Sequence, residues 1–347
     1  MNNDHFSPSA CHNLMYETSG RELEWQADSY PSVEHWQSHL RDKVAGLTGL
    51  TRITPSKDLA VESIWKQDDE LGTIERIVFR SEPHTEVPAY VCLPAGVEKP
   101  YTFFICVQGH STGMHNSIGR SFDDEFALAM PEGDRDFALG CMRRGIAALC
   151  IEQRAFGYRQ EQLQQNRAGS YCHDAAMHSL MLGRTLVGER VFDVRRGVDY
   201  LSLRGDAAMD RIGLMGNSGG GTTTMFASAL LPEISFAIPS CYFNTFQASI
   251  MSLYHCSCNY VPSILRYAEM SDVMGLFAPR KLVVVAGRDD DIFPLEATQA
   301  SFDRLKGIYR AAGAEDNCRL VIGEGGHRFY ADDAWPVMLS YLNSDQS

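Results

Sequence analysis

Short apolar runs alternate with amphipathic stretches over most of this chain, and this alternation limits its possible folds more than any other feature. Eight runs rich in β-branched or aromatic residues predict strands at 74–80, 87–93, 101–108, 146–152, 211–215, 236–239, 282–286 and 319–322. Apolar residues at helical spacing predict helices between the later strands, at 134–144, 184–203 and 295–312. Strands that alternate with helices form mostly parallel sheets. We therefore predict an α/β fold, with an eight-stranded, mostly parallel sheet and helices on both faces.

The remaining segments predict additions to this sheet. Residues 1–73, with an amphipathic stretch at 33–50, predict an N-terminal helical extension ahead of a main domain at 74–347. The first two strands predict an antiparallel start. Two insertions, near 153–183 and 241–278, each follow a strand end. Because ligands of open α/β sheets bind at the carboxyl ends of the strands, we expect these insertions to shape a binding site. The extension carries Trp25, Trp36 and Trp65, so we expect it to pack either on its own domain or on a second chain in a homo-oligomer.

The charge balance restricts the partners of the chain. It has 31 Lys and Arg against 44 Asp and Glu, a net charge of −13, and no basic stripe. Nucleic acids and anionic membranes are therefore not expected as partners. No basic segment followed by an apolar one occurs near residue 1, and no apolar run could span a bilayer, so we expect a cytoplasmic protein.

The ten cysteines are scattered, which predicts buried free thiols and no disulfide framework.

A glycine-rich turn follows the strand predicted at 211–215. Its sequence is Gly216-Asn217-Ser218-Gly219-Gly220, and a segment able to form a helix comes next. A strand, a G-x-S-x-G turn and a helix together are typical of a nucleophile elbow, in which glycines relieve a strained turn. A second match, Gly109-His110-Ser111-Thr112-Gly113, is followed by loop-like residues. We therefore predict Ser218 as the nucleophile.

A serine nucleophile needs a histidine base that is oriented by a carboxylate, and in this fold the chain order is Ser, acid, His. His327 lies in a glycine-flanked loop after the last predicted strand, whereas His255 precedes the acid candidates. The turn after the strand at 282–286 contains Asp289, Asp290 and Asp291. Spacing alone does not choose among these three aspartates.

Together, these segments resemble the acetyl xylan esterase-like and dienelactone hydrolase-like branch of the α/β-hydrolase superfamily. The resemblance covers residues 33–342 and rests on a leading helix at 36–50, Gln108-Gly109-His110, residues 152–157, Asp210-Arg211-Ile212-Gly213, the Ser218 turn, Ala278-Pro279-Arg280, residues 287–294 and Gly326-His327. The family's spacing of its acid from a glycine and a proline implies Asp290. Two departures keep the substrate open: Ser218 stands where dienelactone hydrolases are known for cysteine, and Gly219 stands where well-described sugar acetyl esterases have glutamine.

The resulting hypothesis is a serine hydrolase that cleaves a small-molecule carboxylic ester with a short acyl group such as acetyl. Ser218 would attack the carbonyl, His327 would move the proton, and Asp290 would hold the imidazole. The backbone N–H groups of Gly219 and His110, with Ser111 as second choice for the latter, would bind the oxyanion. The alternatives are cleavage of an amide, a thioester or a carbon–carbon bond by the same residues, or a non-catalytic binding protein on a degenerate hydrolase fold.

No cofactor or metal is expected. The run His255-Cys256-Ser257-Cys258 suggests zinc, but a structural zinc site needs about four ligands and no second cluster is visible in the sequence. We interpret these cysteines as free thiols. Glu152 and Arg154 end a predicted strand, where we expect a salt bridge that braces the following loop.

Overall fold

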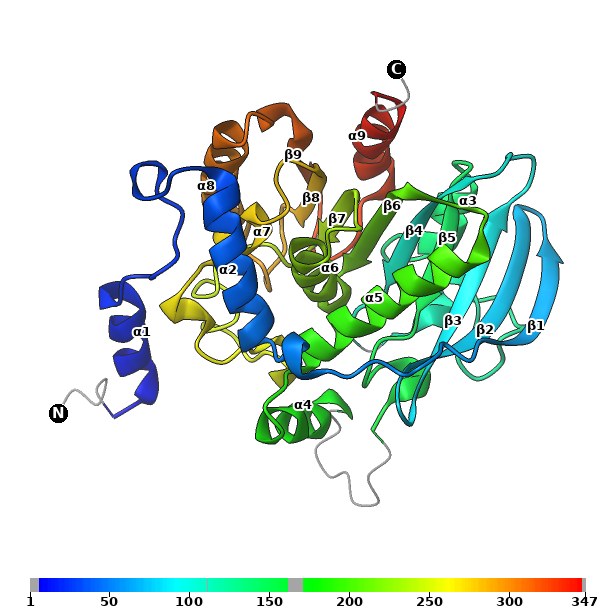
Figure 1. Ribbon diagram of the computed structural model, residues 1–347, viewed down its shortest axis with the longest axis horizontal. Helices are drawn as coiled ribbons and strands as arrows, with labels where there is room; N and C mark the ends of the chain where they lie inside the picture. The colour runs from blue at the N-terminus through cyan, green and yellow to red at the C-terminus, as the bar shows by residue number, and fades with distance from the viewer. Residues whose placement is uncertain (1–5, 111, 162–170, 345–347) are drawn as a thin grey trace.

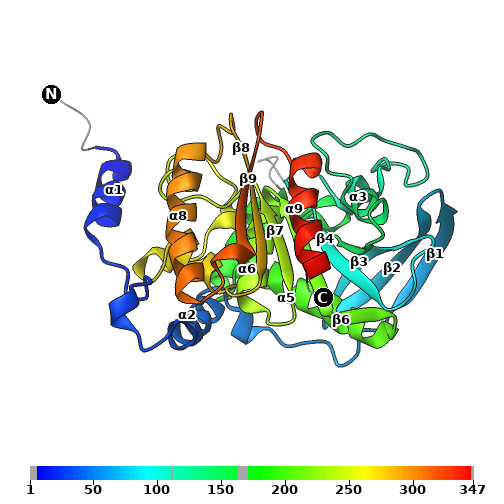
Figure 2. The same cartoon turned by 90° about the horizontal axis from the view of Figure 1, so that it is seen from above.

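The computed structural model describes residues 6–110, 112–161 and 171–344, and within these residues one nine-stranded sheet forms the centre of the molecule (Figures 1 and 2). The strands lie in the order β1-β2-β3-β5-β4-β6-β7-β8-β9. The pairs β1–β2, β2–β3 and β3–β5 are antiparallel. The pairs β5–β4, β4–β6, β6–β7, β7–β8 and β8–β9 are parallel. The bounds are β1 (Glu62–Asp69), β2 (Gly72–Glu82), β3 (Thr85–Pro94), β4 (Tyr101–Val107), β5 (Ala147–Ile151), β6 (Ala207–Asn217), β7 (Phe236–Ser240), β8 (Lys281–Gly287) and β9 (Cys318–Gly323). The predicted α/β fold is confirmed.

Helices cover both faces of the sheet. The helices of the described residues are α1 (Pro8–Thr18), α2 (Val33–Leu47), α3 (Phe137–Met142), α4 (Tyr171–Met181), α5 (Leu186–Arg204), α6 (Gly219–Leu230), α7 (Met270–Gly275), α8 (Leu295–Ala311) and α9 (Ala331–Ser344). Side chains of α2 and of α5 to α8 belong to the hydrophobic core on one face, and those of α3 and α9 belong to the core on the other. In Figure 2, α8 and α9 lie on opposite sides of β8 and β9. In the described part of the chain, no helix combines the length and apolar character needed to cross a membrane.

The central strands are buried on both faces because their apolar side chains alternate between the two cores. Along β4, Phe103 and Ile105 enter one core, and Phe104 and Cys106 enter the other. All five residues of β5 are buried, as are all five of β7. This continuous apolar character is typical of parallel strands between helical layers.

The prediction of eight strands was wrong by one strand. The additional strand, β1, lies within residues 1–73, which were expected to be helical. Its sequence, ESIWKQDD, is mostly exposed and polar, and it pairs with β2 through the backbone at the edge of the sheet. An edge strand with little buried surface has no apolar alternation to mark it, so the pattern was missed.

The rest of the N-terminal segment packs on its own chain. Trp36 of α2 is fully buried in the core, and its indole N–H donates to the Leu23 carbonyl at 2.8 Å. The Trp25 backbone N–H donates to Asp272 of α7 at 3.0 Å, and Trp65 of β1 contacts the Tyr90 ring with centroids 5.7 Å apart. The extension was expected to pack either on its own domain or on a second chain. In the structure, these three tryptophans contact the chain's own domain.

The two predicted insertions meet each other beside the sheet. α4 belongs to the first insertion, and the second contains a 3-10 helix (Ser257–Asn259) that packs against α4. A disulfide joins Cys172 of α4 to Cys256, so the prediction of free thiols was wrong for this pair. These cysteines are separated by 84 residues, and their proximity depends on how both insertions fold. The other cysteines are free, and all of them except Cys11 are buried.

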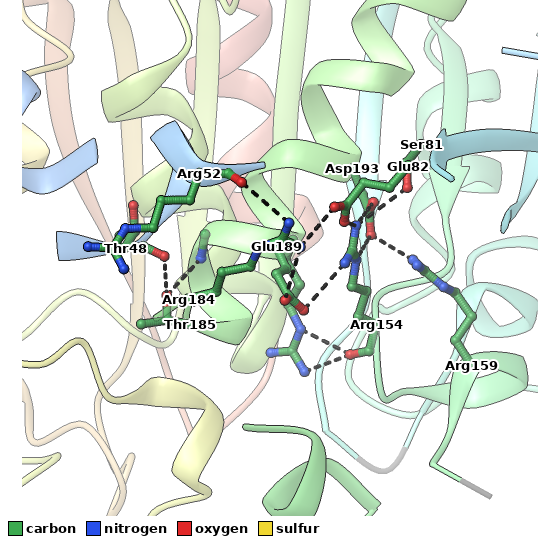
Figure 3. A network of polar contacts seen from close by, with 12 residues as sticks. Thr48, Arg52, Ser81, Glu82, Arg154, Arg159, Arg184, Thr185, Glu189 and Asp193 are labelled. Atoms are coloured by element: carbon green, nitrogen blue, oxygen red, sulfur yellow. Dashed lines mark hydrogen bonds and ion pairs between the residues drawn. The ribbon is translucent and has the colours of Figure 1, made fainter. Parts of the chain in front are cut away.

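A buried ion-pair network fixes the start of the first insertion to the core (Figure 3). Arg154, just after β5, donates from Nε to Asp193 of α5 at 2.8 Å and pairs with Glu82 of β2 at 2.7 Å. Arg159 pairs with the same Asp193 carboxylate at 2.7 Å, and Glu189 lies 3.3 Å from Arg154. Arg154 therefore braces this loop through ion pairs, as expected, but its partners are in β2 and α5.

Candidate active site

Ser218 lies in the tight turn between β6 and α6. Its φ of 58° and ψ of −120° are a conformation that residues other than glycine rarely adopt. A Cβ at Gly216 would lie 2.5 Å from the Val107 carbonyl oxygen, and one at Gly220 would lie 2.1 Å from the same oxygen. Glycine is required at both positions because the backbone of β4 passes directly beside the turn. The strand, strained serine and helix of a nucleophile elbow are all present.

The second G-x-S-x-G match is built differently. Ser111 lies outside the described residues. A five-residue 3-10 helix (Met114–Ile118) follows Gly113, where the Ser218 turn is followed by the twelve-residue α6. A Cβ at Gly113 would lie 2.8 Å from the Glu152 carboxylate, so this glycine permits close packing of two loops.

His327 and Asp290 form a hydrogen-bonded pair at the carboxyl ends of β8 and β9. The Nδ1 atom of His327 lies 2.9 Å from Oδ2 of Asp290. The other carboxylate oxygen of Asp290 accepts from the N–H groups of Ile292 at 3.0 Å and Phe293 at 3.1 Å. The carboxylate is thus held on both oxygens, and one of them fixes the orientation of the imidazole.

Burial separates Asp290 from its two neighbours. Asp290 is 4% exposed, whereas Asp289 and Asp291 are exposed. Burial alone would raise the pKa of Asp290, but the hydrogen bond and charge of His327, with the N–H groups of Phe293 and Ile292, outweigh it and lower the pKa. Asp290 is therefore an anion at neutral pH, as a group that orients an imidazole must be.

The Nε2 atom of His327 is buried and has no hydrogen-bond partner among the described residues. The structure therefore brings Asp290 to His327 but contains no hydrogen bond from Ser218 to this ring. Such contacts are often long without substrate and tighten when substrate binds. Assignment of the three residues as a catalytic triad stays a prediction.

The loop after β4 lies against the serine turn, which brings the two predicted oxyanion donors together. A Cβ at Gly109 would be 2.8 Å from the Asn217 carbonyl oxygen and 3.1 Å from Cβ of Ser218. A Cβ at Gly219 would be 2.8 Å from Nδ1 of His110. Burial, then the charges of Arg190 and His327, lowers the pKa of His110 to about 3, so its ring is neutral.

Sequence reasoning missed the buried Cys241 near this site, and it expected the buried Glu152 to form a salt bridge. Cys241 follows β7 and packs beside Asp290; burial, reinforced by the Asp290 charge, raises its pKa to about 12. Glu152 forms no pair with Arg154; its carboxylate accepts from the N–H groups of Met114 and Tyr158, each at 3.1 Å. Burial raises the pKa of Glu152 to about 7 against the effect of those N–H groups. Both residues directly follow a strand, and this position was the feature of the sequence that could have marked them as neighbours of the site.

His255 was excluded as the base by the chain order of the three residue types. Its ring hydrogen-bonds Ser249 at 2.9 Å.

Comparisons with known proteins agree with this architecture. The sequence profile of the Abhydrolase family matches residues 15–320. The Bacillus subtilis (strain 168) protein named "Putative hydrolase YtaP" is 24% identical over 278 residues, which cover 78% of this chain and 88% of that protein.

Solved structures of esterases share the fold. The crystal structure of a "putative acetyl xylan esterase" from Bacteroides fragilis NCTC 9343 has a TM-score of 0.76 at 17% identity, covering 95% of this chain and 83% of that one. A glucuronoyl esterase from Solibacter usitatus has a TM-score of 0.69 at 14% identity, covering 95% and 98%. At these identities the likeness concerns the fold alone. With the profile match over most of its length, the chain belongs to the Abhydrolase family and is a hydrolase of the α/β-hydrolase class.

Proposed function

We propose that this hydrolase cleaves carboxylic esters with a short acyl group through Ser218, His327 and Asp290. The observation that carries the proposal is the Asp290–His327 hydrogen bond of 2.9 Å at the same edge of the sheet as the strained Ser218 turn. The esterase names of several proteins with this fold favour an ester substrate.

In the proposed reaction, Nε2 of His327 accepts the proton of Ser218 as the hydroxyl attacks the acyl carbonyl. This nitrogen suits the role because its partner nitrogen, Nδ1, is bound to Asp290 and Nε2 itself is unpartnered among the described residues. The protonated imidazole then passes its proton to the leaving alcohol, and water releases the acid from the acyl-enzyme by the same steps in reverse order.

The developing oxyanion would be bound by the backbone N–H groups of Gly219 and His110. Gly219 begins α6, and its N–H belongs to the first turn, where helix N–H groups lack helical partners. In such sites, each donor contributes about 2.7 to 4 kcal/mol to the transition state.

Nitrophenyl esters of increasing acyl length test this proposal, with the wild type beside Ser218→Ala. We expect turnover that is highest for acetyl, declines with chain length and is abolished in the variant. Labelling of Ser218 by a serine-directed phosphonate measures nucleophilicity independently of substrate choice.

Each alternative has its own outcome. Faster cleavage of an amide or thioester with the same acyl group would replace the ester assignment but keep the three residues. If the protein neither turns over esters nor reacts with the phosphonate, a binding protein on a degenerate hydrolase fold becomes the better explanation.

A further inference from the structure

Four metal-ligating side chains meet beside the serine turn, although they come from three distant segments. They are His110 of the loop after β4, Cys172 of α4, and Cys256 and Cys258 at the 3-10 helix of the second insertion, and their ligand atoms all lie within 4.8 Å of one another. Nε2 of His110 is 3.1 Å from Sγ of Cys258. We infer that the reduced protein binds one zinc ion at this Cys₃His cluster.

The ligand chemistry fits zinc. Three thiolates and one imidazole form a standard structural zinc set, with Zn–S distances of about 2.3 Å and a tetrahedral arrangement. Sulfurs of such a site are roughly 3.8 Å apart by tetrahedral geometry, within the 4.8 Å spread of the cluster. Small side-chain rotations would therefore suffice.

The surroundings of the cluster are those of a structural metal site. Cys172 is 6% exposed and Cys258 1%, and they pack in one apolar cluster with Phe156, Ala176 and Leu186. A hydrogen bond also joins α4 to the 3-10 helix of the second insertion, because Nδ1 of His173 and the Ser257 hydroxyl lie 2.6 Å apart. Apolar packing and contacts that fix the ligand-bearing backbone are the usual supports of a metal site.

A buried cation provides a second, independent observation. Three thiolates and Zn²⁺ leave a net charge of −1. Arg190 is 1% exposed, and its guanidinium carbon lies 4.1 Å from the centroid of the Phe156 ring, whose centroid lies 4.8 Å from that of His110. Nη1 of Arg190 is buried without a hydrogen-bond partner among the described residues. The buried guanidinium and His110 thus contact the same Phe156 ring, so a positive charge near the cluster would partly offset the charge of the zinc site.

The oxidised and zinc-bound forms are alternatives. In the disulfide form, Cys172 and Cys256 are joined to each other. A thiol reductant supplies the two electrons and two protons that convert this bond to two thiols and is itself oxidised to a disulfide. Zinc then displaces the three thiol protons, so the metal-bound form requires a reducing environment.

The position of His110 gives the proposed metal a positioning role, a step that rests on the proposed function. Nε2 of its ring faces Cys258, and Nδ1 lies against Gly219. A metal bond to Nε2 would hold the loop whose backbone N–H is proposed to bind the oxyanion. The sequence-based expectation of no metal arose because Cys172 and His110 are far from Cys256 in the sequence.

The test is the zinc content of the full chain, purified without a histidine tag under a thiol reductant and measured by elemental mass spectrometry. We expect about one zinc per wild-type chain and a loss of at least about tenfold in Cys258→Ser and in Cys172→Ser. Cys318→Ser removes a buried cysteine outside the cluster and should retain the metal. Cobalt substitution should give thiolate-to-cobalt charge-transfer bands in the wild type that are absent from Cys258→Ser.

The outcomes separate this inference from the ester hydrolase proposal. A reduced wild-type chain without zinc, or zinc that is unaffected by both cluster substitutions, would overturn the metal site whether or not the protein is an esterase. If zinc is present, we expect Cys258→Ser to lower kcat by about 10- to 100-fold with a smaller change in KM, because the oxyanion loop loses its anchor. Unchanged kcat in that variant would reject the positioning role alone.

Discussion

At the scale of single residues, burial distinguishes three carboxyl groups that their position in one turn of the sequence leaves equivalent. Asp289, Asp290 and Asp291 are adjacent carboxylates, but the turn after β8 directs only Asp290 to His327. The two exposed aspartates are consequently a matched control for the buried one.

Replacing Asp290 by Asn should lower kcat for a nitrophenyl ester by about 10³- to 10⁴-fold, because the amide favours the wrong imidazole tautomer. Asp289→Asn and Asp291→Asn should stay within about twofold of the wild type, since both side chains are exposed and only Asp290 bonds His327. Steady-state kinetics and circular dichroism of the three variants would check this. A larger loss in either neighbour than in Asp290→Asn would reassign the acid.

At the scale of elements, the contacts of a helix decide the effect of a substitution more than its propensity does. Gly307 of α8 and Gly275 at the end of α7 are both helical glycines. A Cβ at Gly307 would meet no atom within 4 Å, whereas one at Gly275 would be 2.6 Å from Ile308 and 3.0 Å from Trp36. The same change should therefore have opposite effects in the two helices.

Gly307→Ala should raise the free energy of unfolding by about 0.5 to 1 kcal/mol, because alanine loses less backbone entropy in a helix. Gly275→Ala should lower it by about 1 to 3 kcal/mol through overpacking against Ile308. Urea unfolding followed by circular dichroism measures both. Stabilisation by Gly275→Ala would show that α7 moves freely away from α8.

At the scale of the whole molecule, buried charges connect elements that are far apart in the sequence. The Arg154 network joins β2, the loop after β5 and α5 (Figure 3). Asp193 is its centre, with a side chain 2% exposed and ion pairs to both Arg154 and Arg159.

Asp193→Asn should destabilise the protein by about 3 kcal/mol or more, because two buried guanidinium groups lose their shared counter-charge. Asp199→Asn is the matched control: Asp199 is on the same helix, but its side chain is 45% exposed in its pair with Arg196. We expect a cost of about 1 kcal/mol or less there. Equal costs in urea unfolding at pH 7 would contradict the importance of the buried network.

The pH dependence of stability should reflect two opposing sets of carboxyl groups. Burial is the largest single influence on the pKa values in both sets. It raises the pKa of Glu269 to about 7 and that of Asp272 to about 6, whereas at Asp193 the charges of Arg154 and Arg159 outweigh it and hold the pKa well below its usual range. A carboxyl with a raised pKa stabilises the fold most below its unfolded pKa, and this stability is lost as pH rises through the folded pKa. The contribution of Asp193 to stability changes with pH in the opposite direction, because it is lost as the pH falls below about 4.

Glu269→Gln should flatten the fall in unfolding free energy between pH 4.5 and 7.5 by an amount on the order of 3 kcal/mol. The exposed Glu296→Gln should leave the slope unchanged. Urea midpoints at a series of pH values measure the slopes. A wild-type slope in Glu269→Gln would mean that Glu269 does not couple folding to protonation.

The sequence by itself determined the features that depend on local backbone preference. The buried parallel strands, α5, α8 and the Ser218 turn were all predictable, because apolar periodicity and glycine spacing act within a few residues. The strand β1 was not predictable in this way, since its polar sequence becomes a strand only by pairing with β2.

Only the tertiary structure decided which distant side chains meet. It placed the buried Asp290 against His327, joined Arg154 to Asp193 and Glu82, and brought Cys172 and His110 to Cys258. None of these contacts leaves a periodic pattern in the chain. They arise because packing of the helices and insertions on the sheet determines which polar groups lose water and must find partners in each other.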